Sequence, residues 1–90
     1  MEEKLLYKIH VSGYVQGVGF RWSTVRAAKN LGITGFVKNL SDGSVYIEAE
    51  GSGKQLKSFV DWCIKGPGDV ESVTTDQYPP VNYGDFRIEY

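Results

Sequence analysis

Cysteine, histidine and proline are scarce in this 90-residue sequence, and their scarcity excludes several kinds of site. The single cysteine, Cys63, cannot form an internal disulfide bond. One cysteine and one histidine also cannot supply the ligands of a structural zinc site. No apolar run is long enough for a signal peptide or a membrane span, because charged residues interrupt the N-terminal stretch 1–8. We therefore expect a cytoplasmic protein that makes no membrane contact and holds no metal or other cofactor.

An excess of charge of either sign is also absent. Ten Lys and Arg residues stand against eleven Asp and Glu residues, for a net charge of −1. Nothing in this balance favours non-specific binding to a nucleic-acid backbone, so any bound anion must be held by local groups. With 41% hydrophobic and 23% charged residues, the composition is that of an ordinary globular protein. The length is enough for one hydrophobic core and predicts a single domain over residues 1–90.

The hydrophobic pattern predicts a regular order of strands and helices. Period-two alternation marks the strands, helical spacing with glycine stops marks the helices, and Asp-Gly marks a tight hairpin turn. The predicted elements are, in chain order, strand 5–11, helix 20–31, strands 35–40 and 44–50, a helix between Ser52 and Gly66, strand 70–74 and a short strand 86–90. This order predicts an α+β ferredoxin-like β-α-β-β-α-β sandwich, an antiparallel sheet with two helices on one face and a short fifth strand.

The same periodicities assign side chains to buried or solvent faces. In strand 5–11, Leu6, Lys8 and His10 alternate with the apolar residues of the buried face, and we expect His10 to face solvent. Glu48 and Glu50 fall on the wet face of strand 44–50 by the same alternation. The apolar stripe of the second helix contains Leu56, Phe59, Val60, Cys63 and Ile64. Trp22 and Trp62 are interpreted as packing residues, the usual role of aromatic side chains in a small domain.

The segment between the first predicted strand and helix contains three glycines, Gly13, Gly17 and Gly19. Glycines there let the backbone turn sharply and point successive N–H groups inward, and the helix N-terminus adds partial positive charge. The segment therefore suits a cluster of anionic oxygens. It is not a Walker loop, because no Gly-Lys-Ser/Thr follows it. A tight strand-to-helix connection that happens to use glycine is the simpler interpretation of the glycines alone.

Two polar residues are candidates for chemistry. Arg21 falls in the first turn of helix 20–31, where a cation opposes the helix dipole unless an anion is bound; a solvated surface arginine is the alternative. Asn39 stands near the end of strand 35–40, where asparagine is common before a turn. Its amide can also accept from and donate to a water molecule, and so orient it for attack. Whether Asn39 lies near the glycine segment depends on a strand pairing that the sequence does not show.

Two motifs resemble the signatures of the acylphosphatase family. Residues 13–21, GYVQGVGFR, resemble its glycine-loop signature, and residues 35–45, GFVKNLSDGSV, closing at Gly51, resemble its second signature. The resemblance implies metal-independent hydrolysis of the carboxyl–phosphate anhydride of acyl phosphates, with a small-molecule substrate and no nucleic-acid partner. It implies that Arg21 binds the phosphoryl oxygens and that Asn39 positions the attacking water. The backbone N–H groups implied to cradle the phosphate belong to Val15, Gln16, Gly17, Val18, Gly19 and Phe20.

The physical chemistry of acyl phosphates agrees with this assignment. Their leaving group is a carboxylate, so the protein need only position the reactants and stabilise charge. No base is evident near the loop, and we hypothesise that the substrate's own phosphate accepts the proton of the water. Ser44 is a candidate to support Asn39 through a side-chain hydrogen bond. We expect a monomer, and the sequence does not identify the physiological acyl phosphate.

Two other classes of function remain open from the sequence. RNA-recognition modules share the β-α-β-β-α-β order, but their aromatic motif is absent here, and Glu48 and Glu50 would repel phosphates on the open sheet face. A regulatory domain that binds an anion without turnover would keep the glycine loop and would not depend on Asn39.

Overall fold

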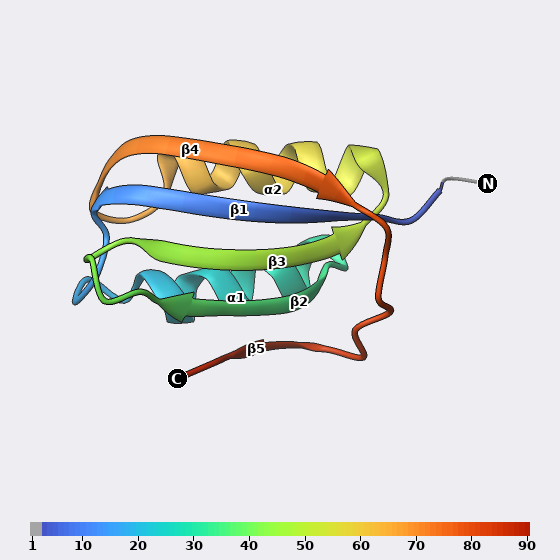
Figure 1. The fold of residues 1–90 in the computed structure, drawn as a ribbon, viewed down its shortest axis with the longest axis horizontal. Helices are drawn as coiled ribbons and strands as arrows, with labels where there is room; N and C mark the ends of the chain where they lie inside the picture. The colour runs from blue at the N-terminus through green and yellow to red at the C-terminus, as the bar shows by residue number, and fades with distance from the viewer. Residues whose placement is uncertain (1–2) are drawn as a thin grey trace.

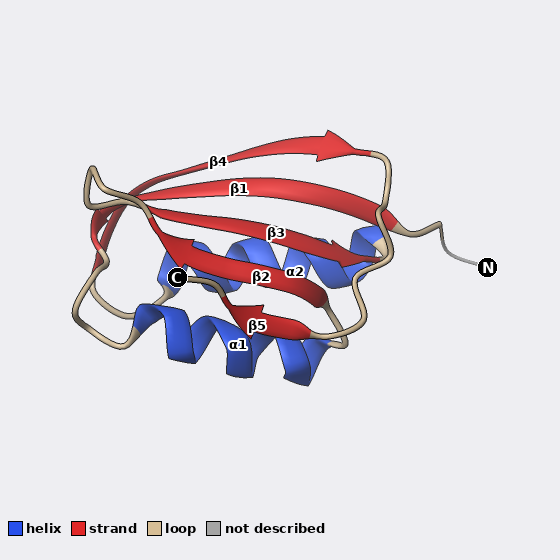
Figure 2. Cartoon of the chain, turned by 60° about the horizontal axis from the view of Figure 1, so that its bottom comes forward, coloured by secondary structure: helices blue, strands red, loops and turns tan. Residues whose placement is uncertain are grey.

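The computed structural model describes residues 3–90; Met1 and Glu2, the first two residues of the predicted domain, lie outside the described part. Five strands form one sheet, and two helices lie against one of its faces (Figures 1 and 2). The elements in chain order are β1 (Leu5–Tyr14), α1 (Phe20–Leu31), β2 (Thr34–Asn39), β3 (Val45–Gly51), α2 (Gly53–Lys65), β4 (Asp69–Tyr78) and β5 (Phe86–Ile88). The predicted ferredoxin-like α+β fold is confirmed.

The strand order β4-β1-β3-β2-β5 determines which loops meet. Both β1 and β2 pair antiparallel with β3, which lies between them, so β1 and β2 run in the same direction. Their C-terminal ends therefore lie at the same end of the sheet (Figure 1). This pairing brings the glycine segment that follows β1 to the end of the sheet that carries Asn39.

The sheet is antiparallel through its first four strands and gains a parallel edge. In chain order β5 comes last, and it pairs parallel with β2 in the register Gly35↔Phe86 to Val37↔Ile88. The strand β4 is twice as long as the predicted strand 70–74, since it continues to Tyr78. It is an edge strand with most of its side chains exposed, so the hydrophobic alternation that would have predicted its second half is absent.

The local signals at the helix ends are confirmed. Helix α1 is preceded by Gly19 (φ 76°) and followed by Gly32 (φ 73°), both in the left-handed conformation that glycine adopts without strain. Helix α2 begins with a capping box, in which the Ser52 hydroxyl accepts from the Gln55 N–H and the Gln55 side chain accepts from the Ser52 N–H. Gly19 and the capping box mark the starts of the two helices, and Gly32 marks the end of α1.

The hydrophobic core lies between the sheet and the two helices. Its buried residues include Ile9, Val11, Val37, Val45, Ile47 and Ala49 from the sheet and Phe20, Ala28, Leu56, Phe59 and Cys63 from the helices. Burial raises the pKa of the Cys63 thiol to about 12, so this thiol is a packing group and not a nucleophile. The placement of Ile64 in the buried stripe was wrong, since its side chain is 53% exposed. It lies about 100° further around the helix than Cys63 and so points away from the sheet.

The wet-face assignment of Glu50 was also wrong, because its side chain is only 1% exposed. The segment between β4 and β5 crosses the sheet where β3 ends (Figure 1), and the Glu50 carboxylate accepts the backbone N–H groups of Val81, Asn82 and Tyr83. Leu6, opposite Glu50 in the β1–β3 register, is likewise buried at 2% exposure. Glu50 therefore anchors the crossing segment, which leads the chain to β5 at the other edge of the sheet.

Candidate functional site

The end of the sheet where β1 and β2 finish carries a small hollow between the glycine segment and α1. Its volume is about 140 Å³, roughly the liquid volume of five water molecules. It is lined by Val15, Gly17, Gly19, Phe20, Arg21, Trp22, Asn39 and Ile88, and we call it the loop pocket. The sequence left open whether Asn39 lies near the glycine segment. In the structure, Arg21 and Asn39 line the same pocket.

The backbone of the glycine segment has two residues in the left-handed conformation. Gly17 (φ 77°) and Gly19 (φ 76°) both have left-handed backbone conformations, and alternation of such residues with right-handed ones makes concave nests of N–H groups. Among the hydrogen bonds of residues 3–90, none has a backbone N–H of residues 15–20 as its donor. A Cβ atom at Gly17 or Gly19 would meet nothing within 4 Å. Glycine is therefore required there by conformation, not by lack of space.

Gln16 and Val18, unlike Gly17 and Gly19, are not among the residues that line the loop pocket. The Gln16 side chain turns toward the β2–β3 hairpin, where its Nε2 donates to the carbonyl oxygens of Leu40 and Ser44, each at 2.8 Å. Val18 packs partly buried against the core. The Gln16 amide thus ties the glycine segment to the hairpin that carries Asn39, and it holds the two walls of the pocket in register.

Replacing Gln16 with alanine is expected to lower the free energy of unfolding by about 1 to 3 kcal/mol, because two hydrogen bonds to backbone carbonyls are lost. Urea denaturation of the variant and the parent protein measures this difference. The matched control is Gln77→Ala on the exposed edge strand β4, for which a change within about 0.5 kcal/mol is expected. Equal stability of the two variants would show that the Gln16 tie contributes nothing.

Asn39 presents an unusual feature for a residue at a strand end. Its Oδ1 atom is buried and has no hydrogen-bond partner among residues 3–90. A buried carbonyl oxygen without a partner is destabilising by about 1 to 3 kcal/mol, and such groups in native structures need an explanation. A role in binding a water molecule or a hydrogen-bond donor of a ligand is one such explanation.

The predicted support of Asn39 by Ser44 is not found. The Ser44 hydroxyl donates to Asp42 Oδ1 at 2.5 Å and lies 2.8 Å from His10 Nε2. Because that hydroxyl hydrogen is directed to Asp42, His10 Nε2 must be the donor toward Ser44 Oγ. The hydrogen bonds from the Ser44 side chain and backbone hold the pKa of Asp42 below its usual value. Ser44 therefore orders the hairpin turn, and His10 is half-buried against it instead of free in solvent.

Arg21 lies in the first turn of α1, as predicted, and its charge is not used by a carboxylate. The single salt bridge in the described part of the chain joins Arg87 to Asp85. The Arg21 guanidinium lies over the ring of Tyr90, 5.2 Å from its centroid, a cation–π contact that leaves its N–H donors available. The positive charge at the pocket is therefore free to meet an anion.

Two pocket residues were not found from the sequence. Trp22, interpreted as a packing residue, is 60% exposed and lies at the pocket, with the Arg26 guanidinium 5.1 Å from its ring centroid. Its position just outside the helical spacing of the core residues was the available signal. Ile88 comes from β5, and only the parallel pairing of β5 with β2 brings it to the pocket.

Two classes of feature are not seen in the described residues. Within residues 3–90 no group of three or more His, Cys, Asp and Glu side chains is arranged to hold a metal ion. Neither helix of that part of the chain has the length and apolar character needed to cross a membrane.

Comparison with known proteins gives a consistent result. The family model described as Acylphosphatase matches residues 7–88. The chain is 48% identical over 85 residues to the acylphosphatase of Thermotoga petrophila, which covers 92% of this chain and 94% of that protein. The crystal structure of the Bacillus subtilis acylphosphatase superposes with a TM-score of 0.93 at 37% identity, over 96% of this chain and 99% of that one. The Coxiella burnetii acylphosphatase gives a TM-score of 0.92 at 35% identity, over 96% and 93%.

Proposed function

Because the chain belongs to the acylphosphatase family, we propose that the loop pocket is where it hydrolyses acyl phosphates. The observation that carries the proposal is the meeting of three features in one pocket. These are an arginine without a carboxylate partner, a glycine segment with unused backbone N–H groups, and a buried amide oxygen without a partner. Together they supply positive charge, hydrogen-bond donors and a site for an oriented water molecule.

In this proposal the phosphoryl group of the substrate occupies the pocket. Arg21 binds two of its oxygens through the guanidinium fork, and the backbone N–H groups of residues 15–20 donate to the oxygens that face the loop. The pocket volume of about 140 Å³ accommodates a phosphoryl group, which has four non-hydrogen atoms. The charge that spreads over these oxygens in the transition state then meets donors that are already in position.

Asn39 is proposed to orient the nucleophile. Its side-chain amide, which lines the pocket, forms a hydrogen bond with a water molecule, whose oxygen is thereby directed at phosphorus. The water oxygen forms a bond to phosphorus, and the bond between phosphorus and the acyl oxygen breaks, with its electron pair leaving on the carboxylate. The proton of the water passes to a phosphate oxygen. The products are the carboxylate and inorganic phosphate, and we propose that no metal is required.

Hydrolysis of benzoyl phosphate in water enriched in oxygen-18 tests this reaction. Attack at phosphorus places the label in inorganic phosphate, and mass spectrometry of the two products measures its distribution. Label in benzoate would show attack at the carbonyl carbon, which the proposed placement of the phosphoryl group and water does not allow. A regulatory domain that binds an anion without turnover would release neither product.

The acyl group of the substrate is proposed to lie at the mouth of the pocket. Because the phosphoryl group is proposed to occupy this small pocket, the phenyl ring is expected to rest on Trp22 and Ile88 of its lining. Trp22 is suited to this contact because it is exposed and its ring is held by a cation–π contact with Arg26.

Replacing Trp22 with alanine is therefore expected to raise KM for benzoyl phosphate by about 2- to 10-fold, the worth of one aromatic contact. The KM for acetyl phosphate, whose methyl group is too small to reach the indole, is expected to stay within about 2-fold of the parent value. Steady-state kinetics with both substrates measure the difference, and Trp22→Phe serves as the control that keeps a ring. Equal changes for both substrates would contradict the contact.

We further propose that the protein acts as a monomer and as one domain, with no nucleic-acid partner. The open sheet face carries Glu48, whose carboxylate accepts hydrogen bonds from the hydroxyl groups of Tyr46 and Tyr83, each at 2.5 Å. The pKa of Tyr83 is raised to about 12, mainly by burial and next by the hydrogen bond to Glu48. Aromatic rings bound to a carboxylate in this way are a poor surface for stacking the bases of a polyanion.

A further inference from the structure

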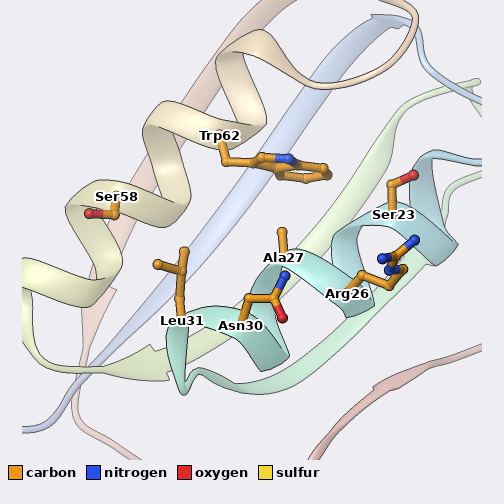
Figure 3. Close-up of a pocket in the computed structure, with 7 residues that line it drawn as sticks. All are labelled: Ser23, Arg26, Ala27, Asn30, Leu31, Ser58 and Trp62. Carbon is orange, nitrogen blue, oxygen red and sulfur yellow. The ribbon is translucent and has the colours of Figure 1, made fainter.

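A second hollow lies between the two helices and has no assigned role. Its volume is about 430 Å³, and its lining residues are Ser23, Arg26, Ala27, Asn30 and Leu31 of α1 with Ser58 and Trp62 of α2 (Figure 3). We call it the helix groove. It shares no lining residue with the loop pocket, and it is wide and open to solvent, with Arg26, Asn30 and Ser58 exposed.

The spacing of the lining residues shows that two helix faces are turned toward each other. The α1 side is formed by positions three or four residues apart, such as Ser23, Arg26 and Asn30, and the α2 side by Ser58 and Trp62, four residues apart. Ala27 and Leu31 supply apolar surface between them, and Figure 3 shows the Trp62 ring reaching from α2 over Ala27. The groove is thus apolar in its middle and polar along its α1 side.

The Trp62 ring is held in place by the core. It stacks on Phe59 with ring centroids 6.2 Å apart and an interplanar angle of 15°, and it packs against Phe20 at 5.6 Å. Trp62 is half-buried, so part of the indole remains free toward the groove. An aromatic wall that is already fixed loses little conformational entropy when a planar ligand packs against it.

Arg26 is the one charged residue among those that line the groove. Its guanidinium lies 5.1 Å from the centroid of the Trp22 ring, and it makes no salt bridge within residues 3–90. No carboxylate lines the groove. The lining of the groove therefore combines one cation that has no carboxylate partner within residues 3–90 with the Trp62 ring, apolar surface and the amide of Asn30.

We propose that the helix groove binds a small planar aromatic carboxylate. The ring of the ligand packs against Trp62, Ala27 and Leu31, and its carboxylate meets the guanidinium of Arg26. The Asn30 amide and the hydroxyl group of Ser23 or Ser58 supply further donors at the rim. This site shares no lining residue with the loop pocket, whose Trp22 ring Arg26 also contacts, and its occupant needs no phosphoryl group.

Titration with 2-naphthoate, followed by NMR on the intact chain, tests the proposal. The reporters are the indole N–H of Trp62 and the side-chain amide of Asn30, both in the groove. We expect saturable shifts at both signals and a Kd that rises about 10-fold or more in Arg26→Gln. In Lys29→Gln, which removes an exposed cation of α1 outside the groove, the Kd is expected to be unchanged. The neutral analogue 2-naphthamide is expected to bind about 10-fold more weakly than 2-naphthoate.

A second variant keeps the test independent of Arg26. Ser58→Trp fills the groove from an exposed position of α2, so it is expected to abolish the shifts without lowering the thermal unfolding temperature. Three results would overturn the proposal: the absence of shifts at Trp62 and Asn30, shifts centred on Gly17 and Gly19 that disappear in Arg21→Gln, or shifts that follow protein concentration because a second copy of the chain fills the groove. The first two of these results leave the proposed hydrolysis unaffected.

Discussion

Replacement of Arg21 with glutamine is expected to lower kcat/KM for acyl phosphate hydrolysis by about 10³-fold or more. The neutral amide removes both the charge and the guanidinium fork that meet the phosphoryl oxygens, and arginines in comparable roles are worth about 10³ to 10⁵ in rate. Competitive inhibition by inorganic phosphate is expected to weaken as well, because Arg21 is proposed to contact the same oxygens in the ground state. Steady-state kinetics with benzoyl phosphate measure both effects.

Two further variants make the Arg21 result specific. Arg21→Lys keeps the charge but not the fork, and it is expected to recover only part of the lost rate. Arg87→Gln removes an exposed arginine that pairs with Asp85, and it is expected to leave kcat/KM within about 2-fold of the parent value. An Arg21→Gln protein that is folded by circular dichroism and still turns over at the parent rate would remove Arg21 from the mechanism.

Replacement of Asn39 with alanine is expected to lower kcat by about 10² to 10³-fold while the protein keeps its stability. The loss of rate follows from removal of a positioned polar group, which typically has an effect of this size. Stability is expected to stay within about 0.5 kcal/mol of the parent value, because Asn39 Oδ1 makes no hydrogen bond to another residue within residues 3–90. Kinetics and urea denaturation on the same sample measure the two quantities.

A large loss of rate without a loss of stability distinguishes a catalytic role from a structural one. Ser41→Ala, at an exposed position of the same hairpin, is expected to change neither quantity. Asn39→Asp keeps the shape of the side chain but adds a negative charge beside the phosphoryl group, and it is expected to lose activity as Asn39→Ala does. If Asn39→Ala unfolds more easily and hydrolyses benzoyl phosphate normally, the residue is a structural turn residue, as the simpler interpretation of its position holds.

The parts of the fold that local chemistry controls could be predicted from the sequence. The bounds of α1, its glycine stop at Gly32 and the Ser52–Gln55 capping box all depend on residues within a few positions of one another. The hairpin at Asp42-Gly43 is equally local, and Gly43 has the positive φ of 93° that the turn requires. Each of these signals has one physical cause that does not involve the rest of the chain.

The predictions that were wrong concern residues whose surroundings are formed by distant parts of the chain. Glu50 was assigned to solvent because strand alternation describes only its own strand, whereas its burial is produced by residues 81–83, about thirty positions later in the chain. Leu6 is buried at the same end of the sheet. The role of Ile88 at the loop pocket depends on the parallel pairing of β5 with β2, which a three-residue strand cannot signal.

The residues of the candidate site also divide into those placed by local sequence and those placed by strand pairing. The glycine segment and Arg21 are contiguous in the chain, so their meeting was predicted with the motif, whereas the position of Asn39 beside them required the β1–β3–β2 pairing. The prediction that Ser44 supports Asn39 failed because Asp42, two residues away, is a closer acceptor for the Ser44 hydroxyl. Short-range hydrogen bonding of serine to its own turn is a common outcome.

Steady-state hydrolysis of benzoyl phosphate by the unmodified protein, with and without EDTA, is the direct test of the proposal that this chain hydrolyses acyl phosphates without a metal. We expect release of benzoate and inorganic phosphate in equal amounts, at a rate that EDTA does not change and that inorganic phosphate inhibits competitively. A folded protein that releases neither product would contradict the proposed reaction. Hydrolysis that EDTA abolishes would contradict a mechanism in which Arg21, Asn39 and the loop backbone are sufficient.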